Sequence, residues 1–229
     1  MQKSKESPFI DLIVSIVIPS VVLMKFSGKD DLGPTMALIV ALAFPICWGL
    51  YELIVNKKRN FIALLGIISV LLTGGIGLLQ LDNKWLAIKE AAIPLIIGLV
   101  VLGSTFTRFP LVRTLLYNPK VMNVDKISQR LEEKQQTDLF EKRLLSANYL
   151  LAGTFFFSAV MNYILAKWIV VSPSGSEAFN EELGRMTLMS YPVIAIPSMI
   201  MMIGIFYFLW RTINRLSGLS LEEVVATQE

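Results

Sequence analysis

Six blocks of mainly apolar residues, each long enough to cross a lipid bilayer as a helix, dominate this 229-residue chain. A spanning α-helix needs about 20 apolar residues, because it rises about 1.5 Å per residue through a hydrocarbon core about 30 Å thick. The blocks cover residues 9–26, 35–55, 61–81, 87–107, 148–171 and 188–210. They predict an all-α polytopic membrane protein, a single integral membrane domain over residues 1–229, with six transmembrane helices arranged as three hairpins.

Composition narrows the classes of function. Charged residues make up 17% of the chain, against about a quarter in a typical soluble domain. The chain has no His and a single Cys, Cys47, so zinc, haem and Cys–His chemistry lack their ligands or nucleophiles. We therefore expect no cofactor, no metal site and no catalytic residue, and we expect the protein not to be an enzyme.

The distribution of Lys and Arg predicts the orientation. Fifteen of the 21 lie at the N-terminus, after the second and fourth blocks, and at the C-terminus. Cytoplasmic loops carry an excess of Lys and Arg, so both termini are predicted to be cytoplasmic. Trp85, Trp168 and Trp210 lie at predicted helix ends, as in an interfacial aromatic belt. The segment 172–185, SPSGSEAFNEELGR, is predicted to be a polar loop on the opposite side.

Residues 108–147 are predicted to form a cytoplasmic amphipathic linker between the fourth and fifth helices. Ile127, Leu131 and Leu139 form a sparse apolar stripe among charged residues. One interpretation is short helices lying on the inner leaflet, and the other is a docking surface for a protein partner. The modest net charge and few aromatic residues do not indicate nucleic-acid binding.

The polar residues within or at the ends of the apolar blocks include Lys89, Glu90, Asn148 and Asn162. Lys89 either snorkels to the headgroups beside Trp85 or turns into the bundle. Adjacent helix positions differ by about 100°, so Glu90 is expected to face elsewhere, as a surface residue. Asn148 and Asn162 point roughly the same way, either bonding neighbouring helices or lining a polar path.

Prolines and glycines punctuate the helices. Pro45, Pro94, Pro192 and Pro197 lie in the second helix of their hairpins and hint at repeated hairpins. These four prolines and Pro110 are candidate helix-break residues. Gly74, Gly75 and Gly77 form a small-residue face on the third helix that permits close approach of a neighbouring helix. The same face permits a homo-oligomer.

Three motifs together resemble the family of bacterial intracellular septation protein A. They are Asp82 with Trp85 and Lys89, then Pro110, Leu111 and Arg113 in FPLVRTLL, then the pair Asn148 and Asn162. Glu90 stands where the family commonly has Pro, and the polar segment 117–143 is longer, which indicates a diverged branch. The resemblance implies a multi-pass protein of the bacterial inner (plasma) membrane, and it implies that Lys89, Pro110, Arg113, Asn148 and Asn162 matter.

The resemblance implies a non-enzymatic role in cell-envelope maintenance and cell division, acting through other membrane proteins in the lipid bilayer. The residues themselves leave a second reading open, a small transporter or channel for a small solute or ion, with a polar path near Lys89 and Asn162. A third reading, an intramembrane enzyme acting on lipids, would have to use Lys89, Glu90, Glu52 and Asp11.

Overall fold

A computed structural model describes residues 12–55, 61–107, 110–119 and 121–225. Every regular element in these ranges is a helix, and the one bridging pair, Met122 with Val225, is isolated. Four helical stretches are long and apolar enough to cross a membrane, which is the architecture of a membrane protein. They are Gly33–Tyr51, Lys84–Ser104, Thr137–Ile169 and Glu177–Ser217. Ile13–Lys25 and Leu64–Leu78 are shorter apolar helices.

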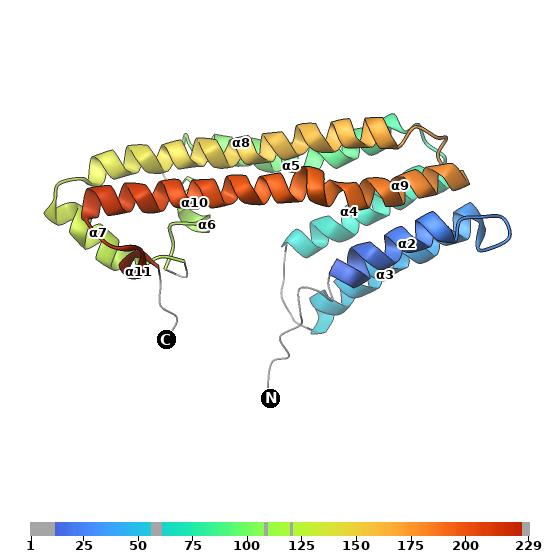
Figure 1. The fold of residues 1–229 in the computed structure, drawn as a ribbon, viewed down its shortest axis with the longest axis horizontal. Coiled ribbons are helices and arrows are strands. Elements are labelled where there is room, and N and C mark those ends of the chain that lie inside the picture. The colour runs from blue at the N-terminus through green and yellow to red at the C-terminus, as the bar shows by residue number, and fades with distance from the viewer. Residues whose placement is uncertain (1–11, 56–60, 108–109, 120, 226–229) are drawn as a thin grey trace. The chain divides into compact units, whose positions relative to one another are not determined.

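The chain divides into two compact units. The first comprises Met1–Ala91 with Met161–Val193, and the second comprises Ala92–Val160 with Ile194–Glu229. The helices, labelled in Figure 1, are η1 (Ile13–Val17), α2 (Ile18–Lys25), α3 (Gly33–Val55), α4 (Phe61–Leu78), α5 (Lys84–Ser104), α6 (Leu111–Leu115), α7 (Val124–Glu133), α8 (Thr137–Ile169), α9 (Glu177–Ser190), η2 (Tyr191–Ala195), α10 (Ile196–Ser217) and α11 (Leu221–Val224).

In the first unit, α3 packs against α2, α4 and α9, and α2 packs against α9. Glycines allow the closest of these approaches. A Cβ added to Gly74 would lie 2.8 Å from Leu42 Cδ1, and one added to Gly77 would lie 2.5 Å from Leu38 Cδ2. The predicted close approach is therefore confirmed for Gly74 and Gly77, and the neighbour is α3 of the same chain, whereas Gly75 faces open space.

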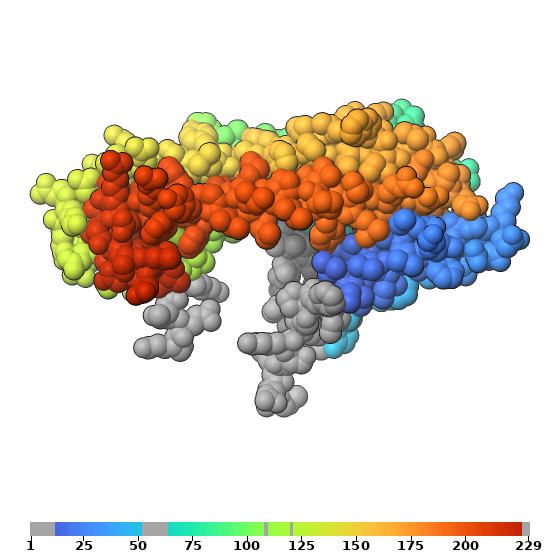
Figure 2. All heavy atoms as spheres, in the orientation of Figure 1, coloured from blue at the N-terminus to red at the C-terminus, as the bar shows by residue number. Residues whose placement is uncertain are grey.

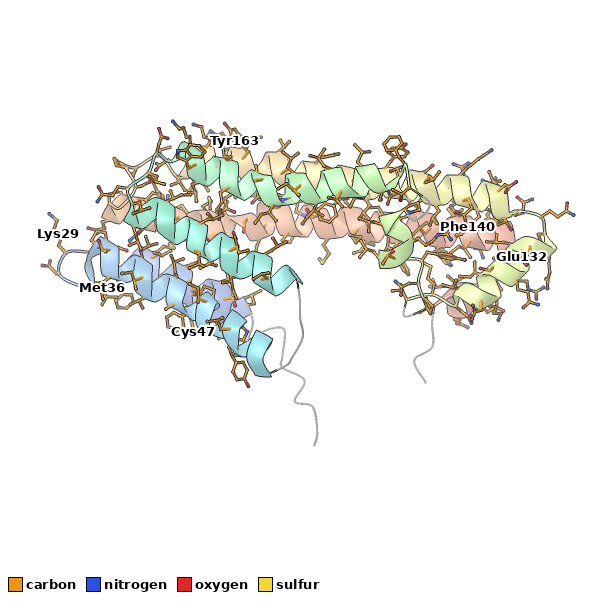
Figure 3. All side chains as sticks on the ribbon, turned by 180° about the vertical axis from the view of Figure 1, so that it is seen from behind. Lys29, Met36, Cys47, Glu132, Phe140 and Tyr163 are labelled. Carbon is orange, nitrogen blue, oxygen red and sulfur yellow. The ribbon has the colours of Figure 1, made fainter. Side chains whose placement is uncertain are left out.

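The loops predicted to lie opposite the termini are joined by hydrogen bonds at one end of the first unit. The Asn83 amide donates to the Ser172 carbonyl (2.5 Å) and accepts from the Ser174 hydroxyl (2.7 Å). The buried Asn180 amide donates to the Pro34 carbonyl at 2.7 Å. Figure 3 shows Lys29 in the connection between α2 and α3 at this end. These bonds join the loop after α4 to the loop after α8, and α9 to the start of α3.

The second unit has a hydrophobic core built largely from the predicted linker. Ile127 and Leu131 of α7 are fully buried with Phe140 and Leu144 of α8. Figure 3 shows Glu132 on the outer side of α7, and Leu139 is 43% exposed. Ile127 and Leu131 therefore face neither the leaflet surface nor a partner, the two interpretations left open for this stripe, because the protein's own helices cover them.

The C-terminal residues close this core. The Asn123 N–H donates to the Val224 carbonyl at 2.9 Å, and Lys126 pairs with Glu223 at 2.9 Å. Ser220 and Glu223 form a capping box on α11. The Ser220 N–H, with Lys126, lowers the pKa of Glu223 to about 2, so this carboxylate stays ionised at neutral pH. Figure 2 shows α11 and the end of α10 as one surface with α7.

Two helices are longer than the sequence predicts. α8 begins at Thr137 rather than near residue 148, and the stretch Glu177–Ser217 is continuous, so the loop predicted at 172–185 is mostly helix. The Ser176 side chain caps α9 by accepting from the Phe179 N–H, and Phe179 and Leu183 bury one face of it. The Ser176 cap and the apolar residues at helical spacing therefore stabilise a helix within this polar segment.

The prolines interrupt hydrogen bonding without ending the helices. Pro45 and Pro94 lie inside α3 and α5, and Pro192 lies in the π-helical turn η2. Pro197 lies in the first turn of α10, where its missing N–H costs least. Pro110 is the residue before α6, with an extended ψ of 138° that starts that short helix.

Candidate functional site

Lys89 and Glu90 form an ion pair within the apolar helices of the first unit. Nζ of Lys89 lies 2.6 Å from Oε1 of Glu90, and the two side chains are 9% and 23% exposed. The expectation that they diverge, with Glu90 on the surface, is wrong. Their Cα–Cβ bonds do differ in direction by about 100°, but the long, flexible stem of Lys89 brings its ammonium back to the neighbouring carboxylate.

The Lys89 ammonium has two more partners, both on α4. It donates to Thr73 Oγ1 at 2.7 Å and to Ser69 Oγ at 3.2 Å. The Thr73 hydroxyl donates its own proton to the Ser69 carbonyl at 3.1 Å, which leaves its lone pairs for the ammonium. An ammonium has three protons, so Glu90, Thr73 and Ser69 satisfy all of them.

These partners lie toward the interior of the bundle. Thr73 and Ser69 are five and nine residues before Leu78, the last residue of α4. At about 1.5 Å per residue they lie roughly 7 and 13 Å inside that helix end. Lys89 therefore points into the first unit and not toward headgroups near Trp85.

The ion pair borders a cavity of about 220 Å³. Lys89 and Glu90 are its only ionisable lining residues among those that the structure describes, so its wall is formally neutral. Other polar lining side chains come from four helical segments: Ser15, Ser20, Ser69, Thr73, Asn162, Thr187 and Ser190. Thr187 and Ser190 each donate to a carbonyl of their own helical turn, so their oxygens remain available as acceptors toward the cavity.

Ser20 is a cavity residue that the sequence analysis does not single out. Its side chain is 1% exposed, and its hydroxyl has no hydrogen-bond partner among the described residues. A buried hydroxyl without a partner costs about 1–3 kcal/mol, which a bound polar molecule would offset. The sequence does carry a signal: Ile18-Pro19-Ser20 follows the π-helical turn η1, and the same tripeptide, residues 196–198, follows η2.

The two predicted asparagines belong to different units. Asn162 lines the cavity with Lys89. Asn148 is fully buried in the second unit, where its Oδ1 accepts from the Val112 N–H at 3.0 Å. Its Nδ2 lies 2.8 Å from the Val101 carbonyl, 2.9 Å from Thr105 Oγ1 and 3.1 Å from Ser104 Oγ. Asn148 therefore connects α8 to the end of α5 and the start of α6.

Arg113 and Pro110 lie near Asn148. Arg113 pairs with Glu141 of α8 on the partly exposed side of α6, and Pro110 precedes α6. The residues that carry the family resemblance thus fall into two groups. Lys89 and Asn162 border the cavity, whereas Pro110, Arg113 and Asn148 shape the turn from α5 into the folded segment that follows.

Asp11 and the side chain of Glu52 lie outside the described residues. Across the ranges that the structure does describe, no three Asp, Glu or Cys side chains gather closely enough to hold a metal ion.

Asn148→Ala is expected to destabilise the protein by about 2–4 kcal/mol, because it leaves the buried Val112 N–H without an acceptor and removes the amide's bonds to the end of α5. Asn162→Ala, on the same helix but beside the cavity, is the matched control and is expected to cost less. Thermal unfolding of both variants in detergent measures the difference. Equal stability of the two variants would contradict a structural role specific to Asn148.

The chain matches no protein-family model, no curated protein and no solved structure. The resemblance to the septation protein A family therefore stays a prediction. The function is therefore inferred from the geometry of the cavity beside Lys89 and of the residues around Asn148.

Proposed function

We propose that the protein is a small membrane transporter or channel that holds a polar solute or ion in the Lys89–Glu90 cavity. The observation that carries the proposal is an ion pair, with two hydroxyl groups on its ammonium, beside a cavity lined by helices of the first unit. A buried ion pair adds little net stability, because desolvation of both charges offsets their attraction. Ionisable side chains at membrane depth are rare and tend to mark substrate or ion paths.

The lining chemistry suits a small solute without net charge. One ammonium and one carboxylate sit side by side, so a zwitterion can place its ammonium on Glu90 and its carboxylate on Lys89, where it would replace the Ser69 hydroxyl as an acceptor. The Ser20 hydroxyl and the Asn162 amide supply further polar contacts. A cavity of about 220 Å³ limits the solute to a small molecule.

The proposed setting is the bacterial inner membrane, crossed six times with both termini in the cytoplasm. The Lys and Arg distribution supports this orientation. The hydrogen-bonded loops at one end of the first unit, around Asn83 and Asn180, support three hairpins entering from the same side. Packing of the segment after α5 against the C-terminal α11 supports a shared cytoplasmic location for both.

A thermal-unfolding screen tests the cavity. Purified protein is heated in detergent with zwitterions (glycine, alanine, betaine), inorganic cations, inorganic anions and neutral polyols. A ligand that binds only the folded state at 100 times its Kd stabilises it by about 2.7 kcal/mol. We expect at least one zwitterion to raise the Tm of the wild type, and Lys89→Met combined with Glu90→Leu to abolish that rise.

The double variant removes both charges together, because removal of one alone would leave an uncompensated buried charge at a cost of about 3–5 kcal/mol. Lys167→Met combined with Glu177→Leu, at exposed positions of the first unit, is the matched control and should keep the response. Equal Tm shifts in the wild type and the cavity variant would refute this site. Uptake of the stabilising solute into proteoliposomes then separates a transporter from a receptor.

A second, non-enzymatic role in envelope maintenance and division is supported by the folded segment of the second unit. A segment with its own buried core can present a defined surface to another membrane protein. A deletion of residues 120–140 would remove Ile127 and Leu131 from the hydrophobic core and so change folding as well as binding. Substitutions on the surface of α7 leave the core intact and therefore test binding alone.

Gln129→Lys combined with Glu132→Lys should abolish co-purification with division or envelope membrane proteins. Both side chains are exposed and neither enters the core. Glu177→Lys combined with Ala178→Lys, in a predicted outer segment, is the control and should not affect it. Unchanged co-purification with the α7 variant would count against this role.

A further inference from the structure

An open groove of about 800 Å³ lies in the second unit between the first turns of α8 and the last turns of α10. Four cationic side chains line it: Lys134, Arg143, Arg211 and Arg215. The groove has no carboxylate among its lining residues. It belongs neither to the Lys89 cavity nor to the Asn148 hydrogen bonds.

Three segments bring these charges together. Arg211 and Arg215 are four residues apart on α10 and therefore share one face. Arg143 comes from α8. Lys134 follows α7, and its ammonium lies 2.7 Å from where a Cβ on Gly218 would stand. Gly218 ends α10 with a φ of +79°, a conformation that glycine adopts without strain, and its lack of a side chain leaves room for Lys134.

The four cations lack an acidic partner within the part of the chain that the structure describes. Among the described residues none of them has a carboxylate within 4.0 Å, whereas Arg113, Lys126 and Arg130 of the same unit each pair with a Glu. Four like charges around one groove repel each other, and a bound anion would relieve that repulsion.

The position of the groove indicates which class of anion it binds. The apolar stretch of α10 ends at Trp210, a predicted interfacial residue, and Arg211 follows it directly. Phe208, which lies in that apolar stretch one turn before Arg211, also lines the groove. The charges therefore lie at the headgroup level of the predicted cytoplasmic leaflet, where anionic phospholipids are concentrated.

We infer that this groove binds the phosphate headgroup of an anionic phospholipid. Arg143, Arg211 and Arg215 donate hydrogen bonds to the phosphate oxygens, and Lys134 adds a fourth positive charge at the cytoplasmic end. Guanidinium groups suit this task because their planar donors match two phosphate oxygens at once. Phe208 contacts the first part of the acyl chains.

Native mass spectrometry of the full chain, released from nanodiscs of mixed phosphatidylglycerol and phosphatidylcholine, tests the inference. The wild type should retain phosphatidylglycerol in preference to phosphatidylcholine. Arg143→Gln combined with Arg215→Gln should lower that retention by at least about tenfold, since each basic residue near an anionic leaflet contributes appreciably to binding. Arg143→Lys combined with Arg215→Lys should keep most of it.

Lys142→Gln combined with Lys29→Gln removes the same charge at exposed positions outside the groove and should retain lipid like the wild type. Equal retention in the Gln groove variant and the wild type, or no preference for phosphatidylglycerol, would overturn the inference. Displacement of the lipid by added glycerol 3-phosphate would also overturn it, because the groove would then take a soluble phosphate. The Tm of each variant without lipid verifies that it is folded.

Discussion

An ammonium group inside an apolar helix bundle must find three acceptors, and the arrangement of the first unit follows from how Lys89 finds them. Glu90 supplies the countercharge from the next position, and Ser69 and Thr73 supply hydroxyl oxygens from α4. These bonds require α4 to lie against the start of α5. Gly74 and Gly77 in turn let α3 approach α4 closely. Polar groups from other helices then surround the remaining space, which is the cavity.

In the second unit, the chain leaves one apolar helix, forms a polar segment and then enters another apolar helix. Asn148 satisfies the backbone groups exposed at this turn, at the end of α5 and the start of α6. The apolar residues of α7 and α8 then bury one another, and α11 closes the core. The cationic groove lies along the outside of this structure, where α8 and α10 extend beyond their apolar stretches.

Much of the fold could be predicted because hydropathy and charge act over whole helices. The apolar blocks locate the helices, and the glycine face of α4 predicts close packing. The start of α8 and the helix at 177–190 were missed because their stability comes from caps and buried faces within polar sequence, such as Ser176 and Phe179. The Lys89–Glu90 contact differs from the prediction because the helical angle describes Cβ directions and not the reach of a long side chain. The repeated Ile-Pro-Ser tripeptide marks Ser20 in the sequence, but it gives no sign that the hydroxyl is buried without a partner.

Whether water reaches the Lys89 cavity inside the membrane decides between a solute path and a packed structural pair. In a Cys47→Ala background, Ser190→Cys places a thiol on the cavity wall, and Met189→Cys places one on the neighbouring exposed apolar surface. Charged methanethiosulfonate reagents react with thiolates, which form only where water is present. The proposed path predicts rapid modification of the Ser190→Cys variant in membranes and little of Met189→Cys. Equal, slow modification of both variants would contradict it.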